Sequence, residues 1–333
     1  MPHGATIFGC SGPVLTAQEA AFFRDADPWG FILFARNIDT PDQVRALTDA
    51  LRAAVGWNAP VLIDQEGGRV QRMGPPHWRQ WMPPLDQVAC AGAAAMESLS
   101  LRARVIAAEL RAVGVDVNCA PLADIAGAAT HPFLRNRCVG TDAAEVARNA
   151  RAMAEGFLAG GVLPVIKHLP GHGRATLDSH KALPQVETPH ADLSRSDFAA
   201  FAPLADLPLA MTGHILFTDL DPDRPATLSP RLIGVIRDEI GFDGLLMTDD
   251  ICMGALGGAL AARCADAMAA GCDVVLHCNG EMDEMRDVAA ASGTLTAAGE
   301  RRAAAALAAR RAPEAADPDA LMARLAELLE PAA

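Results

Sequence analysis

The sequence predicts an α/β protein of one domain, a (β/α)8 TIM barrel with extra C-terminal helices. Short apolar runs typical of buried strands recur eight times, and segments with helical spacing separate most of them. No G-x-G-x-x-G motif follows the first run, as a dinucleotide-binding sheet would require. Because strands that alternate with helices pair in parallel through right-handed crossovers, eight such units favour a closed barrel over an open sheet.

The individual elements follow from composition and spacing. We expect strands at residues 5–8, 31–34, 61–63, 115–118, 162–166, 209–212, 245–248 and 274–276. We expect helices at residues 42–55, 97–113, 142–158, 230–239, 256–270 and 282–291. Ala-rich helical sequence follows from about residue 297 to 329. The expected domain therefore covers residues 1–333, with a C-terminal helical extension at about residues 295–330.

Composition limits the partners and the compartment. The formal net charge is −13, and no run of Lys and Arg occurs, which argues against nucleic acid and membrane surfaces as partners. The eight cysteines include no C-x-x-C pair, which indicates reduced thiols. Neither a secretory leader nor an apolar stretch of 18 residues is present, so we expect a cytoplasmic protein.

Polar residues recur where the apolar runs stop. In a barrel of this class, catalytic side chains lie at the C-terminal ends of the strands and in the loops that follow. Five of the eight expected strand ends carry such residues, which are Asp64, Lys167, His168, His214, Asp249, Asp250 and His277. This recurrence predicts a catalytic site at the mouth of the barrel.

The segment from Ile166 to His180 reads Ile-Lys-His-Leu-Pro-Gly-His-Gly-Arg-Ala-Thr-Leu-Asp-Ser-His and is predicted to be a functional loop. Asp178 and His180 are two residues apart, so the carboxylate can orient the imidazole while its other nitrogen faces a substrate. This arrangement suits a proton shuttle. A solvated turn with a bystander histidine is the alternative.

A zinc site is a second alternative for the same loop. His168, His172 and His180 could be ligands, but their spacing matches no H-E-x-x-H pattern, and Lys167 would lie beside the metal. We therefore expect no metal.

Two further segments carry candidate residues. Gly244-Leu-Leu-Met-Thr-Asp-Asp250 runs a buried strand into Asp249 and Asp250. One carboxylate there could cap a helix, but glycoside hydrolysis needs an anionic nucleophile and a proton donor, roles that Asp249 and His180 could fill. In the other segment, Asp64 and Arg72 flank Gly67-Gly68 and could bind vicinal hydroxyls or simply form a salt bridge.

These blocks resemble glycoside hydrolase family 3, and in particular its bacterial single-domain β-N-acetylhexosaminidases of cell-wall recycling. The resemblance runs from about residue 30 to residue 255 and rests on Asp64-Gln-Glu-Gly-Gly-Arg-Val-Gln-Arg72, Lys167-His-Leu-Pro-Gly-His-Gly173, Asp178-Ser-His180, Pro225-Ala-Thr-Leu-Ser229 and Gly241-Phe-Asp-Gly-Leu-Leu-Met-Thr-Asp-Asp250. The chain departs from the family pattern at Leu169, at Cys138-Val139 and at Ile251-Cys252, changes that leave the charged residues in place.

The resemblance implies a function and a role for each residue. Asp249 would be the nucleophile, His180 the acid/base and Asp178 its partner. The residues expected to hold a terminal N-acetylglucosamine are Asp64, Arg72, Arg137, Lys167 and His168. The implied protein is a monomeric, retaining exo-β-N-acetylglucosaminidase without a cofactor. Its implied substrate is N-acetylglucosaminyl-β-1,4-anhydro-N-acetylmuramic acid, with or without peptide.

Other functions remain open at this point. The same barrel could host another family 3 β-glycosidase or an N-acetylglucosaminide phosphorylase. From other classes, a sugar-binding barrel without activity and a metal-dependent amidohydrolase are alternatives. If His180 only binds the sugar, Glu66 is the first candidate for the proton donor.

Overall fold

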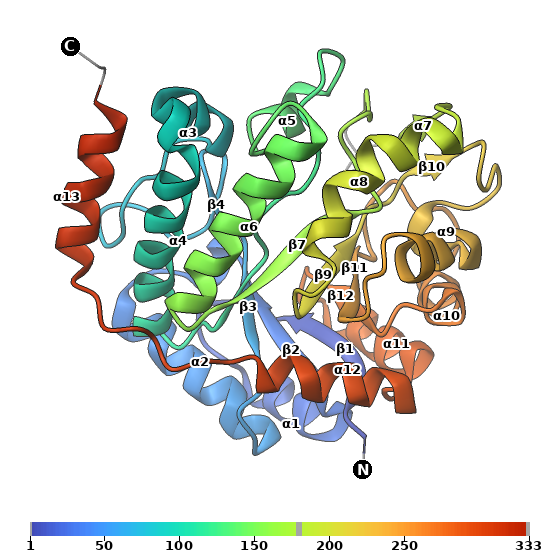
Figure 1. Cartoon of the computed structure of the whole chain (residues 1–333). Helices are drawn as coiled ribbons and strands as arrows, with labels where there is room; N and C mark the ends of the chain where they lie inside the picture. The colour runs from blue at the N-terminus through green and yellow to red at the C-terminus, as the bar shows by residue number, and fades with distance from the viewer. Residues whose placement is uncertain (1, 178–181, 331–333) are drawn as a thin grey trace.

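The computed structural model describes residues 2–177 and 182–330 and confirms the predicted barrel (Figure 1). Eight strands form a closed ring in the order β1-β12-β11-β9-β7-β6-β3-β2. Every pairing within the ring is parallel, and the pairing of β1 with β12 closes it, with Thr6 opposite Val275. The strands are β1 (Gly4–Gly9), β2 (Pro28–Leu33), β3 (Val61–Ile63), β6 (Val117–Asn118), β7 (Leu163–Leu169), β9 (Leu209–Thr212), β11 (Leu245–Asp250) and β12 (Val274–His277).

Two pairs of short strands lie outside the ring. They are the antiparallel pair β4 (Gln65–Gly67) and β5 (Val70–Gln71), and the parallel pair β8 (Gln185–Val186) and β10 (Leu216–Phe217). The first pair directly follows β3, so it places the residues after Asp64 over the mouth of the barrel.

The strand boundaries differ from the predictions in an informative way. β2 begins at Pro28, before the predicted start at residue 31. The prediction started late because Pro28 and Gly30 suggest a turn, yet both residues are buried in the ring. β7 and β11 continue beyond the expected ends, through Lys167 and His168 and through Asp249 and Asp250. The strands extend because their backbones continue to pair with neighbouring strands, with Asp250 opposite Leu276 of β12 and Leu169 opposite Thr212 of β9.

Helices surround the barrel. They are α1 (Ala17–Ala26), α2 (Pro41–Val55), α3 (Pro84–Ala91), α4 (Ala95–Ala112), α5 (Pro132–Arg135), α6 (Ala143–Ala159), α7 (His190–Arg195), α8 (Asp197–Phe201), α9 (Pro230–Gly234), α10 (Leu260–Ala270), α11 (Met282–Ser292), α12 (Ala297–Ala308) and α13 (Pro318–Leu329). Short 3-10 turns occur at η1 (Ala35–Asn37), η2 (Gly92–Ala94), η3 (Ala202–Leu204) and η4 (Ala226–Leu228), and η5 (Val235–Glu239) is a π-helical turn.

Helix α2 shows how the sequence specifies these helices. Thr40 caps its N-terminus by accepting a hydrogen bond from the amide of Gln43, and Pro41 occupies the first turn. Its buried residues are Val44, Leu47, Thr48 and Leu51, which lie on one helical face. Gly56 ends the helix in the left-handed conformation.

Two helix predictions need correction, whereas the predicted C-terminal helices are present. The helix expected at residues 256–270 begins at Leu260, because Gly257 and Gly258 precede it. The helix expected at residues 230–239 divides into α9 and the π-helical turn η5. The C-terminal helical sequence forms α12 and α13, separated by an irregular stretch that contains Pro313.

The C-terminal helices contact different parts of the barrel. Arg302 of α12 forms ion pairs with Asp243 and Asp273, which precede β11 and β12. Helix α13 packs beside α4 (Figure 1), where Arg324 pairs with Glu97. The larger of two hydrophobic clusters connects buried residues from Ala5 to Leu325. Within the described ranges, no helix has the length and apolarity needed to cross a membrane.

Candidate active site

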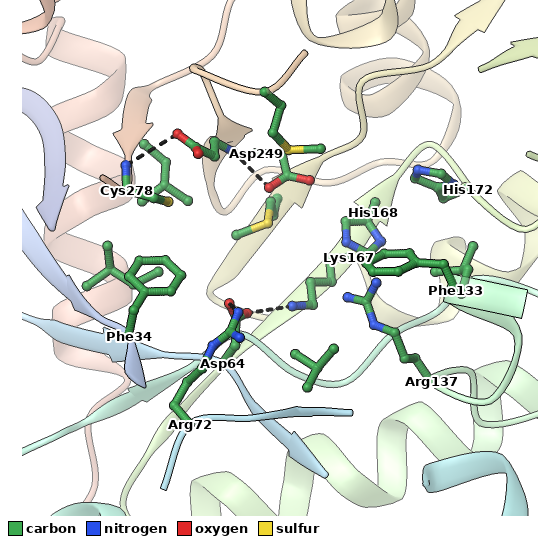
Figure 2. A pocket seen from close by; sticks show the side chains of 17 residues that line it. Phe34, Asp64, Arg72, Phe133, Arg137, Lys167, His168, His172, Asp249 and Cys278 are labelled. Carbon is green, nitrogen blue, oxygen red and sulfur yellow. Dashed lines mark hydrogen bonds and ion pairs between the residues drawn. The ribbon is translucent and has the colours of Figure 1, made fainter. Parts of the chain in front are cut away.

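The C-terminal ends of the strands surround a pocket of about 220 Å³ (Figure 2). Six of the predicted site residues line it, namely Asp64, Arg72, Arg137, Lys167, His168 and Asp249. The pocket is smaller than those that hold drug-sized ligands, and it suits a single small ring. The other two predicted residues, Asp178 and His180, lie outside the described residues.

Asp64 organises the positive charges on one side of the pocket. Its two oxygens bind Lys167 Nζ at 2.8 Å and Arg72 Nη2 at 2.9 Å. Burial by itself would raise the pKa of Asp64, but the charges of Lys167 and Arg72 outweigh it and hold the pKa below its usual range. The salt bridge expected as an alternative is therefore present, and it lies within the pocket wall.

Glu66 is a buried residue that the sequence analysis considered only as a proton donor. It binds Arg137 through two hydrogen bonds of 2.8 Å and lies 2.7 Å from Lys167 Nζ. Burial tends to raise the pKa of Glu66, but Arg137 and Lys167 lower it overall, so the carboxyl group is ionised. An ionised, enclosed carboxylate does not donate a proton, so the structure argues against that role. Glu66 instead positions the two cations.

The β4–β5 hairpin brings Arg72 back toward Asp64. The side-chain oxygen of Gln65 accepts hydrogen bonds from the amides of Arg72 and Met73, both at 3.0 Å. Gly67 has a φ of +105°, and a Cβ there would collide with the guanidinium of Arg102. The glycine therefore permits the close approach that the turn requires.

Lys167 and His168 both line the pocket although they are adjacent in β7, where neighbouring side chains ordinarily alternate. The pairing of β7 with β9 shifts register between Ile166 and Leu169, and the Lys167–His168 peptide bond is cis. Register shifts of this kind are frequent beside active sites.

Asp124 is a site residue that the sequence analysis missed. Its carboxylate contacts His168 Nδ1 at 2.7 Å and accepts the amide of His172 at 2.6 Å. The side chain is buried, and its pKa is lowered overall because His168 opposes the effect of burial. The signal in the sequence was an acidic residue in the apolar stretch Asn118-Cys-Ala-Pro-Leu-Ala-Asp124, soon after a strand. Asp124 leaves Nε2 of His168 available to a ligand.

Asp249 and Asp250 have different environments at the end of β11. Asp249 lies across the pocket from Asp64 and Arg72 (Figure 2), and its carboxylate accepts the amide of Asp250 at 2.8 Å. Burial tends to raise the pKa of Asp249, but His168 and His214 lower it overall, so the group is an anion as a nucleophile must be.

Asp250 instead accepts backbone amides. Its Oδ1 receives the amides of Cys252 at 3.2 Å and of Cys278 at 3.3 Å, and burial raises its pKa. Asp250 therefore holds the loop after β11 and the end of β12 together, and neither carboxylate caps helix α10, whose N-cap is Ala259. His214 Nε2 lies 3.0 Å from the carbonyl oxygen of Asp250.

The zinc site considered as an alternative would include His180, which lies outside the described residues. Burial and the neighbouring His168 lower the pKa of His172 to about 4, so this imidazole is neutral. No group of potential metal ligands within the described part of the chain includes His168 or His172.

Comparisons with known proteins agree with the fold. The profile of the glycosyl hydrolase family 3 N-terminal domain matches residues 16–308. A β-hexosaminidase of Bordetella avium is 36% identical over 290 residues, which cover 84% of this chain and 81% of that protein.

Solved structures of NagZ from Neisseria gonorrhoeae are also similar. The native structure aligns with a TM-score of 0.87 and 28% identity over 99% of both chains. The complex of that protein with N-trifluoroacetyl-D-glucosamine aligns with a TM-score of 0.85 and 28% identity, again over 99% of both chains.

Proposed function

The chain belongs to glycoside hydrolase family 3, and from this premise we propose that it is a retaining exo-β-N-acetylglucosaminidase acting on muropeptides. The family and the named relatives show a glycosidase of the β-hexosaminidase type. The observation that supports the mechanism best is the anionic Asp249, which lies across a small pocket from the Asp64, Arg72 and Lys167 cluster.

In the proposed reaction Asp249 attacks the anomeric carbon while the bond to the leaving oxygen breaks. His180, oriented by Asp178, gives a proton to that oxygen as the aglycone departs. The imidazole then removes a proton from water, which attacks the glycosyl ester and releases Asp249. Two inversions leave the β-configuration of the sugar unchanged.

The remaining residues have binding roles in this proposal. Lys167 donates and Asp64 accepts hydrogen bonds, so together with Arg72 they match the alternating donors and acceptors of sugar hydroxyls. His168, held by Asp124, presents its other ring nitrogen to the substrate. Arg137 completes the charged wall, because Glu66 holds its guanidinium beside Lys167.

The proposal also covers the natural substrate, the cellular role and the oligomeric state. We propose N-acetylglucosaminyl-β-1,4-anhydro-N-acetylmuramic acid, with or without peptide, as the substrate and cell-wall recycling in the cytoplasm as the role of a monomeric enzyme. The bound N-acylated glucosamine in the related NagZ supports the sugar. All eight cysteines are unpaired, as expected in a reducing compartment.

The alternative is another β-glycosidase or an N-acetylglucosaminide phosphorylase on the same barrel. Chromogenic β-N-acetylglucosaminides and β-glucosides, each with and without phosphate, separate these activities. The proposal predicts cleavage of the first substrate at a rate that phosphate does not change. A phosphate-dependent rate with a sugar phosphate product would establish the phosphorylase.

Trapping the intermediate tests the mechanism. After incubation with a 5-fluoro N-acetylglucosaminyl donor, mass spectrometry of the digested protein should locate one sugar on Asp249. An Asp250→Asn variant serves as the matched control and should still be labelled at Asp249. A label on another carboxylate would contradict the assignment.

A further inference from the structure

Cys252, His277 and Glu284 converge beside the pocket without lining it. They come from the loop after β11, the end of β12 and the first turn of α11. Their three potential ligand atoms all lie within 4.8 Å of one another. His277 Nε2 is 3.1 Å from Glu284 Oε2, and Cys252 Sγ is 3.6 Å from the same oxygen.

These separations match the edges of a metal coordination tetrahedron. Zinc binds nitrogen and oxygen at roughly 2.0 Å and sulfur at roughly 2.3 Å, which places neighbouring ligand atoms roughly 3.3–3.6 Å apart. The two measured separations need to change by only a few tenths of an ångström. The third separation, between the ligand atoms of Cys252 and His277, is within 4.8 Å. Two of the three edges therefore already have nearly the length that a shared cation requires.

The cluster of Cys252, His277 and Glu284 is open to solvent on one side, which leaves room for a water ligand. His277 is buried, whereas the Glu284 side chain is 44% exposed, so a cation and its water can reach the cluster from solvent. Asn279 Nδ2 donates a 2.6 Å hydrogen bond to Glu284 Oε2 and steadies the carboxylate.

We propose that Cys252, His277 and Glu284 form a Zn²⁺ site with water as the fourth ligand. Binding releases the thiol proton of Cys252 to solvent, and the Nε2 proton that His277 shares with Glu284 moves to Nδ1. Among the described residues Nδ1 has no hydrogen-bond partner, unlike the second ring nitrogen in most metal sites. The site therefore binds zinc more weakly than a structural zinc site and exchanges it.

The position of this site links it to the pocket. The amides of Cys252 and Cys278 both bind Asp250, the neighbour of Asp249. A cation held by Cys252 and His277 would fix the loop after β11 against the end of β12. No local pattern indicates this site, because Cys252 and Glu284 are 32 residues apart and match no ligand-spacing pattern.

Cobalt is a suitable probe, because a thiolate ligand to Co²⁺ gives a near-ultraviolet charge-transfer band and a tetrahedral site gives strong visible bands. Thermal shifts are less suitable, since an unfolded chain with eight cysteines also binds metal. Titration of the reduced, metal-free full chain should produce both bands with one equivalent of Co²⁺, and Zn²⁺ should abolish them.

Three variants locate the site. Cys252→Ser should lose the charge-transfer band, and Glu284→Gln, a conservative change at a partly exposed position, should weaken Co²⁺ binding by about tenfold or more. Cys278→Ser is the matched control, because Cys278 is the cysteine that lines the pocket, and it should retain both bands. The proposal is overturned if no thiolate band forms, if the band survives Cys252→Ser, or if Cys278→Ser removes it.

Discussion

The replacement Glu66→Gln tests whether a buried charge that does not line the pocket positions the residues that do. Glu66 is 1% exposed and pairs with Arg137 and with Lys167. Glutamine keeps the shape, but it removes the charge and turns an amide donor toward a cation. Removing one partner of a buried ion pair destabilises a protein by about 3–5 kcal/mol.

This free energy converts into a measurable shift of the melting temperature. With an unfolding entropy of about 2.1 cal/mol/K per residue for 333 residues, this loss of stability should lower the melting temperature by about 4–7 °C. Because Lys167 and Arg137 line the pocket, a displacement of about 1 Å should also lower kcat/KM by about 10²-fold. Calorimetry and steady-state kinetics on a chromogenic β-N-acetylglucosaminide measure the two effects.

Glu109→Gln is the control for this experiment. Glu109 pairs with Arg79 at 2.8 Å, outside the pocket, and burial raises its pKa. Neutralising it should therefore have a smaller effect on the melting temperature and none on kcat/KM. The reasoning about Glu66 is refuted if Glu66→Gln melts like the wild type, or if it melts lower while kcat/KM is unchanged.

Three further predictions concern the chemistry and the titration of the site. Asp249→Ala should reduce turnover by several orders of magnitude with an unchanged circular dichroism spectrum, and retention of more than about a tenth of the activity would disprove the nucleophile assignment. His180→Ala should slow substrates with poor leaving groups far more than activated aryl glycosides, and equal slowing of both would mean that His180 only binds the sugar. The pKa of His172 is about 4 in the folded state, so between about pH 6.5 and about pH 4 mainly the unfolded chain takes up this proton. Stability should therefore fall by up to about 3 kcal/mol from about pH 6.5 to about pH 4, and urea unfolding should show a shallower fall in His172→Gln; an equal fall in both would exclude His172 as the cause.

Local sequence signals located the barrel strands well, because each is a short buried run whose composition identifies it. They failed where packing reverses a local preference. Pro28 and Gly30 suggest a turn, yet they lie in the ring, where neighbouring strands bury both residues. Helices α1 and α3 were missed although Thr16 caps α1 with a complete capping box.

For the candidate site, the sequence predicted the pocket residues at strand ends but missed the buried residues that hold them. Charged residues at strand ends were recognised because their positions depend only on where the strands stop. The partners of those residues were not recognised, since they depend on contacts between distant segments. Asp124 reaches His168 across 44 residues, and Glu66 reaches Arg137 across 71 residues. No local pattern encodes such contacts.

The closure of the ring by β1 and β12 also has a consequence for folding. Asp64 and Lys167 are 103 residues apart, and Thr6 pairs with Val275, so bringing these segments together carries a large loop-closure entropy. During synthesis the ring stays open until β12 has left the ribosome, and the edges of its strands remain exposed until then. In refolding experiments, enzymatic activity should accordingly recover later than helical circular dichroism, which makes activity a specific measure of ring closure.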